Sequence, residues 1–137
     1  MNSNIITATG HLTGESSKYG EFTAIEKVVH YPSYPPPHSE LRIIGNTPYG
    51  GGSHGVILVI KRSEIHKGEY KIADDTDITA IYGHGEPSYF GNTGILTIDE
   101  FKPTEQYVKG SFNFRSLQLD GTVTGTFELN GFKNTSD

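Results

Sequence analysis

The chain of 137 residues has the length of a single domain, and it can bury enough surface for a core without covalent cross-links. It contains no cysteine, which excludes disulfides and thiolate metal sites, and its net charge of -5 with 11 scattered lysines and arginines argues against nucleic-acid binding. Because the N-terminal residues lack the basic and apolar regions of a signal peptide, we expect a soluble, cytoplasmic protein, although leaderless secretion would leave the same pattern.

Strand-forming residues dominate the chain, and almost no stretch has the period of a helix. We therefore expect an all-β fold: one domain over residues 1–137, a single antiparallel barrel or sandwich of about eight to nine strands in largely meander topology. At most one helical turn is predicted, at residues 63–68. The predicted strands are residues 5–12, 21–30, 40–45, 54–61, 69–73, 78–82, 94–101, 106–115 and 122–129.

The first notable loop is "HYPSYPPPH", residues 30–38, which holds four of the seven prolines. Three consecutive prolines remove ladder donors and favour an extended polyproline II segment, so this stretch is predicted to be a loop and not a strand. The stiff run also separates His30 from His38, which disfavours a metal clip.

A glycine-rich stretch, "PYGGGSHG" at residues 48–55, comes next. A phosphate loop would need a helix after it, whereas "VILVIKR" reads as a strand, so a flexible hairpin loop is the better interpretation. Residues 56–60 are apolar at every position, which predicts a central strand covered on both faces.

Acidic and histidine side chains offer few metal ligands in the right pattern. The three carboxylates within residues 74–77 lack the glycine and the distal glutamate of a calcium loop, so an acidic turn is expected. His84 with Glu86, or His66 with Glu64, could reach one ion, but no histidine pair has the spacing of a zinc helix. We predict no metal site, no cofactor and no catalytic residue.

The last two predicted strands have the clearest alternation. Val108, Phe112 and Phe114 alternate with polar residues in the first, and Val123 and Phe127 do so in the second. These apolar faces are predicted to line a common core.

The motifs "GILTIDEF", "VKGSFNF" and "VTGTFELNGF", together with "KGEYKI" at residues 67–72, resemble the strands of small β-rich bacterial domains of unknown function. The resemblance covers roughly the C-terminal half of the chain. It implies a lipocalin-like barrel or sandwich, and it carries no activity with it.

Loop parity predicts where a binding site would lie. In an antiparallel meander, alternate connections share one end of the fold. The second, fourth, sixth and eighth loops should therefore gather together, with Arg115 close by. These loops are residues 31–39, 62–68, 83–92 and 116–121. The opposite end would carry the loop at residues 50–52, the acidic turn at 74–77 and Glu105. The predicted ligand-binding residues are Tyr31, Tyr34, His38, His66, His84, Tyr89 and Phe90.

Three hypotheses about function follow. The first is a non-catalytic binding module that uses this aromatic and histidine-rich end, with a small apolar molecule inside the barrel, a glycan on the rim or a protein as its ligand. The second is an intracellular inhibitor or immunity-type protein whose acidic surface binds a basic partner protein. The third is an enzyme with a site built from His66, His84 and Glu86. The sequence predicts no nucleic-acid partner and no membrane span, and it leaves the oligomeric state open.

Overall fold

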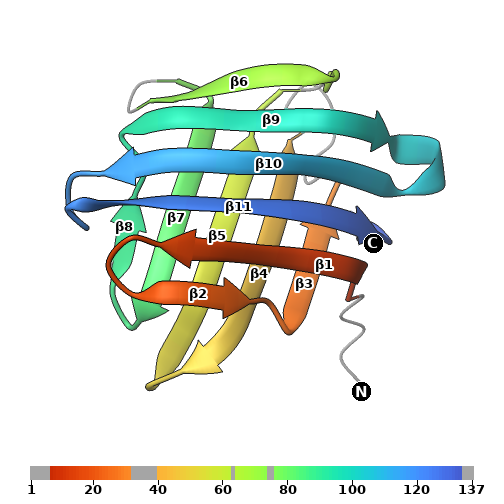
Figure 1. The fold of residues 1–137 in the computed structure, drawn as a ribbon. Helices are drawn as coiled ribbons and strands as arrows, with labels where there is room; N and C mark the ends of the chain where they lie inside the picture. Colours follow the sequence, from red (N-terminus) through yellow and green to blue (C-terminus); the bar gives the residue numbers. More distant parts are fainter. Residues whose placement is uncertain (1–6, 32–39, 63, 74–75, 134–137) are drawn as a thin grey trace.

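The protein is an open sandwich of two antiparallel sheets in the computed structural model, which describes residues 7–31, 40–62, 64–73 and 76–133 (Figure 1). The six-stranded sheet, sheet A, has the order β2-β1-β11-β10-β9-β6, and the five-stranded sheet, sheet B, has the order β3-β4-β5-β7-β8. The strands of the two sheets cross steeply in Figure 1. Their bounds are β1 Thr9–Ser16, β2 Gly20–Thr23, β3 Glu26–His30, β4 Leu41–Tyr49, β5 Gly52–Ile60, β6 Gly68–Ala73, β7 Ile78–Gly85, β8 Ser88–Phe90, β9 Thr93–Lys102, β10 Tyr107–Ser116 and β11 Gly121–Asn130.

The predicted all-β, antiparallel class is confirmed, and the sandwich alternative is the one that forms. The number of strands is eleven, because one predicted strand is divided in two and the short β8 was not predicted. The described residues contain no α-helix and a single 3-10 turn, Pro103–Glu105. The helical turn expected at 63–68 does not form at residues 64–67, and Ser63 lies outside the described residues.

The predicted strand 21–30 crosses from one sheet to the other at its centre. β2 pairs with β1 in sheet A, whereas β3 pairs with β4 in sheet B. The crossing takes place between two neighbours: the Ala24 amide donates to the Leu12 carbonyl in sheet A, and the Ile25 amide donates to the Asn46 carbonyl in sheet B. Alternation of apolar residues tells which face is buried but not which sheet a residue joins, so the pattern could not reveal this crossover.

The core lies between the sheets and is filled by the inward residues of both. Phe112, Phe114 and Phe127 are buried, as their alternation predicts. Two inward positions of sheet A are glycines because aromatic rings occupy the space that a side chain would need. A Cβ atom at Gly14 would lie 2.6 Å from the ring of Phe22, and one at Gly125 would lie 2.4 Å from the ring of Phe112.

Strand β5 is central in sheet B, as the apolar run at residues 56–60 predicts. Its inner face packs against sheet A, where Val56 and Leu58 are buried. Its outer face carries Val59, which is 6% exposed, and the half-buried Ile57, so this face is buried at one end of the strand and partly open at its middle.

Candidate functional site

Seven aromatic and imidazole rings gather at the end of the sandwich where the β1–β2 turn meets the β4–β5 hairpin. We call this group the aromatic end cluster. Its members are Tyr19, Phe22, Tyr49, His54, Tyr82, His84 and Tyr89.

The inner layer of the cluster is a buried, hydrogen-bonded pair. The Tyr82 hydroxyl lies 2.6 Å from Nε2 of His54, and the two residues are 0% and 6% exposed. Burial raises the pKa of the Tyr82 hydroxyl, and its interaction with the buried Ser16 partly opposes that rise, so Tyr82 is a neutral phenol. Burial, and secondarily the neighbouring His84, lowers the pKa of His54 below its usual value of 6.5.

The outer layer presents rings to solvent. Tyr19 stacks on His84 with ring centroids 3.9 Å apart and planes inclined by 4°, and Tyr49 lies 4.4 Å from His84. Tyr19 is 41% exposed and Tyr49 is 50% exposed. Interaction with the Tyr19 side chain raises the pKa of Tyr89. The half-exposed rings of Tyr19 and Tyr49 are thus held by ring contacts before any ligand arrives.

Local sequence explains how sheet B builds the cluster. His54 on β5 and His84 on β7 are direct cross-strand partners, and Tyr82 shares the inner face with His84 because it lies two residues away. Tyr49 comes from the β4–β5 hairpin, which is turned by Gly50 and Gly51 with φ of 54° and 83°. Two positive φ values in a two-residue turn match the type I′ hairpin, so the hairpin expected for this glycine-rich stretch forms.

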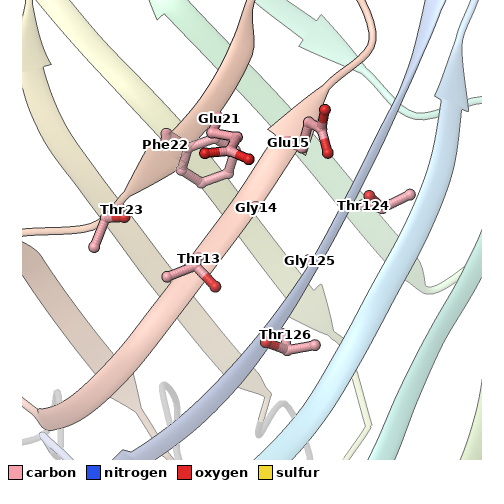
Figure 2. A pocket seen from close by; sticks show the side chains of 9 residues that line it. All are labelled: Thr13, Gly14, Glu15, Glu21, Phe22, Thr23, Thr124, Gly125 and Thr126. Carbon is pink, nitrogen blue, oxygen red and sulfur yellow. The ribbon is translucent and has the colours of Figure 1, made fainter.

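A groove of about 410 Å³ opens on the outer face of sheet A beside this end. Its floor includes the backbone of Gly14 and Gly125, which lie between the threonine side chains of β1 and β11 in Figure 2. Glu15 and Glu21 are cross-strand partners at its rim, and no cation pairs with either of them in the described part of the chain. The remaining lining residues are Thr13, Phe22, Thr23, Thr124 and Thr126.

The groove and the aromatic end cluster are joined by the β1–β2 hairpin. Glu15 and Glu21 flank the turn that carries Tyr19. Phe22 lies beneath Gly14 and also contacts His54, with ring centroids 4.9 Å apart. The hydroxyl and carboxylate groups of the groove therefore lie next to the exposed aromatic rings of the cluster.

Those predicted site residues that the structure describes do not share one end, so the predicted gathering of Tyr31 and His66 with His84 is wrong. In β5, His54 pairs with His84 at one end, whereas Ile60 at the other end leads to His66. Tyr31 belongs to that second end, because it follows β3 and its backbone bonds to Lys133. Tyr34 and His38 lie outside the described residues, as does most of the stretch 30–38.

The individual predicted residues have different surroundings. Tyr31 packs edge-on against Phe101 with ring centroids 5.0 Å apart, and His66 is exposed with Nε2 3.3 Å from the Glu64 carboxylate. His84 and Tyr89 belong to the aromatic end cluster.

Phe90 is 50% exposed on the outer face of sheet B. Its amide donates to the Gln118 side chain at 3.1 Å. The sixth predicted loop, residues 83–92, therefore does meet the eighth, residues 116–121. Arg115 lies close to them, since its carbonyl accepts from the amide of Asn92.

The physical cause of the error is the position of β6. This strand pairs with β9 in sheet A and not with β5, so β5 and β7 are direct neighbours, and the chain leaves β5 at Ile60 and enters β7 at Ile78 at the same end of sheet B. The glycine-rich hairpin at 50–52 consequently lies beside His84, although parity placed the two at opposite ends.

Five members of the cluster were not predicted to belong to the site: Tyr19, Phe22, Tyr49, His54 and Tyr82. A usable signal was present for two of them, since alternation places Tyr82 and His84 on one face and His54 on the inner face of a neighbouring strand. Tyr19 had no such signal, because its position depends on how the two sheets pack.

The separation of His66 from His84 also removes the enzyme site that was built from these two residues and Glu86. Among the described residues, no group of three or more His, Asp or Glu side chains is placed to hold a metal ion. No helix in the described part of the chain is long and apolar enough to cross a membrane.

Comparisons with protein families, with curated proteins and with solved structures give no match to this chain.

Proposed function

We propose that this protein is a non-catalytic binding module that recognises a glycan with the aromatic end cluster and the adjoining groove of sheet A. The observation that carries the proposal is the pair of half-exposed rings, Tyr19 and Tyr49, held against His84 and supported from behind by the buried pair of His54 and Tyr82. Rigid aromatic surface suits recognition because little conformational freedom is lost on binding.

The groove favours a polyhydroxylated ligand over an apolar one. Its threonine hydroxyls can donate and accept hydrogen bonds, and the carboxylates of Glu15 and Glu21 accept from hydroxyl or ammonium groups. Two carboxylates without a cation also disfavour an anionic ligand. The interior between the sheets is filled by core side chains such as Phe114 and Phe127, which argues against an apolar ligand inside the sandwich.

Isothermal titration calorimetry with three hexasaccharides tests the proposal. We expect hexamers of N-acetylglucosamine or glucosamine to bind, and the hexamer of galacturonate, which is anionic, to bind at least about tenfold more weakly. Tyr49→Ala should weaken binding by about tenfold or more, since truncating an anchoring ring costs more than about 1 kcal/mol. Ile95→Ala is the matched control, because Ile95 is 41% exposed on the outer face of β9 in sheet A.

Two results would contradict the proposal: absence of binding to all three hexamers, or unchanged affinity in both Tyr49→Ala and Tyr19→Ala. The exposed tyrosines also suit a protein partner, as an inhibitor or immunity-type protein would have, because tyrosine is a frequent anchor in protein interfaces. Failure with every glycan, combined with capture of a basic protein that the two tyrosine variants lose, would favour that second function.

A further inference from the structure

The outer face of sheet B carries an uninterrupted row of apolar side chains across all five strands. The cross-strand partners are Val28 with Ile44, Ile44 with Ile57, Ile57 with Ile81, and Ile81 with Phe90. The first four are half-buried and Phe90 is 50% exposed. We call this row the ridge. Four strand spacings make it about 19 Å long.

A second row of outward residues runs beside the ridge, two residues away from it on each strand, and it includes two glycines. Gly55 pairs with Gly83 at the centre of this row, Asn46 pairs with Gly55, and Ser88 pairs with Gly83. Two hollows follow it: one of about 80 Å³ is lined by Gly55 and Gly83, and another of about 150 Å³ is lined by Asn46 and Glu26. We call this row the trench.

The composition of this face differs from that of an ordinary solvated sheet. The outward residues of the two central strands, from Ser53 to Val59 on β5 and from Thr79 to Gly83 on β7, include no charged side chain. The charged residues of this face, Glu26 and Arg42, lie on β3 and β4 towards one edge, whereas the outer face of sheet A carries Glu15, Lys109 and Arg115. A sheet face turned to water is normally polar, and depletion of charge marks the centre of a protein interface.

We infer that the ridge and trench form a homodimer interface in which a second copy of this chain is the occupant. The two rows are parallel and about 7 Å apart, which is two residues along a strand. A two-fold axis that runs between them places the ridge of each copy in the trench of the other, with Ile57 over Gly55 and Ile81 over Gly83 of the second copy. Such a surface is complementary to itself, as a closed two-fold contact requires.

The expected dimer is weak. A face about 19 Å long and about 20 Å wide hides roughly 400 Å² per copy, or roughly 800 Å² in total, which is below the standard interface of about 1,600 Å². The dimer should therefore dissociate on dilution.

Gly83 offers a substitution that fills the trench without disturbing the fold. A Cβ atom there would meet nothing closer than 3.8 Å, and β-branched residues suit a strand. Gly83→Thr should therefore fold normally, yet it should oppose entry of Ile81 from the other copy. Ile57→Lys removes the ridge at its centre, and Asn113→Lys on the exposed outer face of sheet A is the matched control.

Sedimentation velocity on the full chain, from about 2 µM to about 500 µM, measures the equilibrium directly. The wild type and Asn113→Lys should shift from 15.0 kDa towards twice that mass as concentration rises. Gly83→Thr and Ile57→Lys should each raise the dimer Kd at least about tenfold, with unchanged circular dichroism and melting temperature. A wild type that stays monomeric throughout, or variants that dimerise like the wild type, would overturn the inference and assign the face to another occupant.

Chemical cross-linking gives a second readout that does not depend on a destabilising substitution. The chain has no cysteine, so a single introduced thiol is unambiguous. Ile81→Cys should give a covalent dimer with a short bis-maleimide, whereas Asn113→Cys should not. Packed sheets lie about 10 Å apart, which is beyond direct disulfide reach and within that of the reagent. Equal cross-linking of the two variants would also refute the interface.

Discussion

Tyr82→Phe tests whether the buried hydrogen bond of the aromatic end cluster stabilises the fold. The substitution removes only the hydroxyl, and the ring contacts with Phe22 and Tyr89 are retained because phenylalanine has the same ring. What is lost is the 2.6 Å hydrogen bond between the Tyr82 hydroxyl and Nε2 of His54. Ser16 still accepts from the amides of Lys18 and Tyr19, so Nε2 of His54 is the buried atom left without a partner.

The magnitude follows from burial. Leaving a buried polar atom without a hydrogen-bond partner costs about 1–3 kcal/mol, and His54 is 6% exposed, so we expect Tyr82→Phe to lower the free energy of unfolding by about that amount. For a chain of this size, each 1 kcal/mol lowers the melting temperature by about 3 °C. Urea denaturation at pH 7.5, followed by far-ultraviolet circular dichroism, measures the loss.

A double-mutant cycle separates the hydrogen bond from the packing of each residue. His54→Leu removes the imidazole. In the double variant with Tyr82→Phe, neither position therefore carries a buried polar atom without a partner. We expect the double variant to be more stable than the sum of the single losses predicts, by about 1 kcal/mol. Strict additivity, or a Tyr82→Phe loss below about 0.5 kcal/mol with an unchanged m-value, would refute the reasoning.

Two further outcomes concern backbone packing and pH. Gly125→Ala should destabilise the fold by about 1–3 kcal/mol, because the added Cβ would lie 2.3 Å from the Thr13 carbonyl oxygen. Gly83→Ala should change stability by less than about 0.5 kcal/mol, because its Cβ has room. Thermal melting compares the two variants, and equal losses would contradict the packing argument. The pKa values of His54 and His30 are lowered in the folded state, so the unfolded state binds protons more readily below pH 6.5. The contribution of these histidines to stability should therefore be constant above that pH. As the pH drops towards the folded-state pKa values, the free energy of unfolding should fall by up to about 1.4 kcal/mol per pH unit per histidine. Denaturation of His54→Gln between pH 7.5 and 5 should show a smaller fall, and an unchanged fall would contradict the assignment.

The fold class was predictable because β structure leaves a local signal. Phe112 and Phe127 alternate with polar neighbours, and each is buried as that period requires. The crossover at Ala24 and Ile25 left no such signal, since alternation continues through it while the hydrogen-bond partners change from sheet A to sheet B.

The cover of the outer face of sheet B could be predicted only in part, for a related reason. An apolar run such as residues 56–60 shows that both faces of a strand are apolar, but it does not say what covers them. On this face Val59 is buried and Ile57 is half-buried, so the cover changes along a single strand. The register shows an apolar ridge that runs through Ile57, which is why a second copy of the chain becomes the natural occupant.

The two proposed surfaces of sheet B are built from alternate residues of the same strands. His54 and His84 face the aromatic end cluster, whereas their neighbours Gly55 and Gly83 face the trench. A substitution in the trench therefore lies one residue from the ligand-binding end, and a displaced strand would alter both surfaces together.

Gly83→Thr separates filling of the trench alone from displacement of strand β7. If only the trench is filled, dimerisation weakens while glycan affinity stays the same, because the side chain of His84 points to the opposite face. If β7 itself moves, both measurements change, and the loss of the dimer can no longer be attributed to the filled trench.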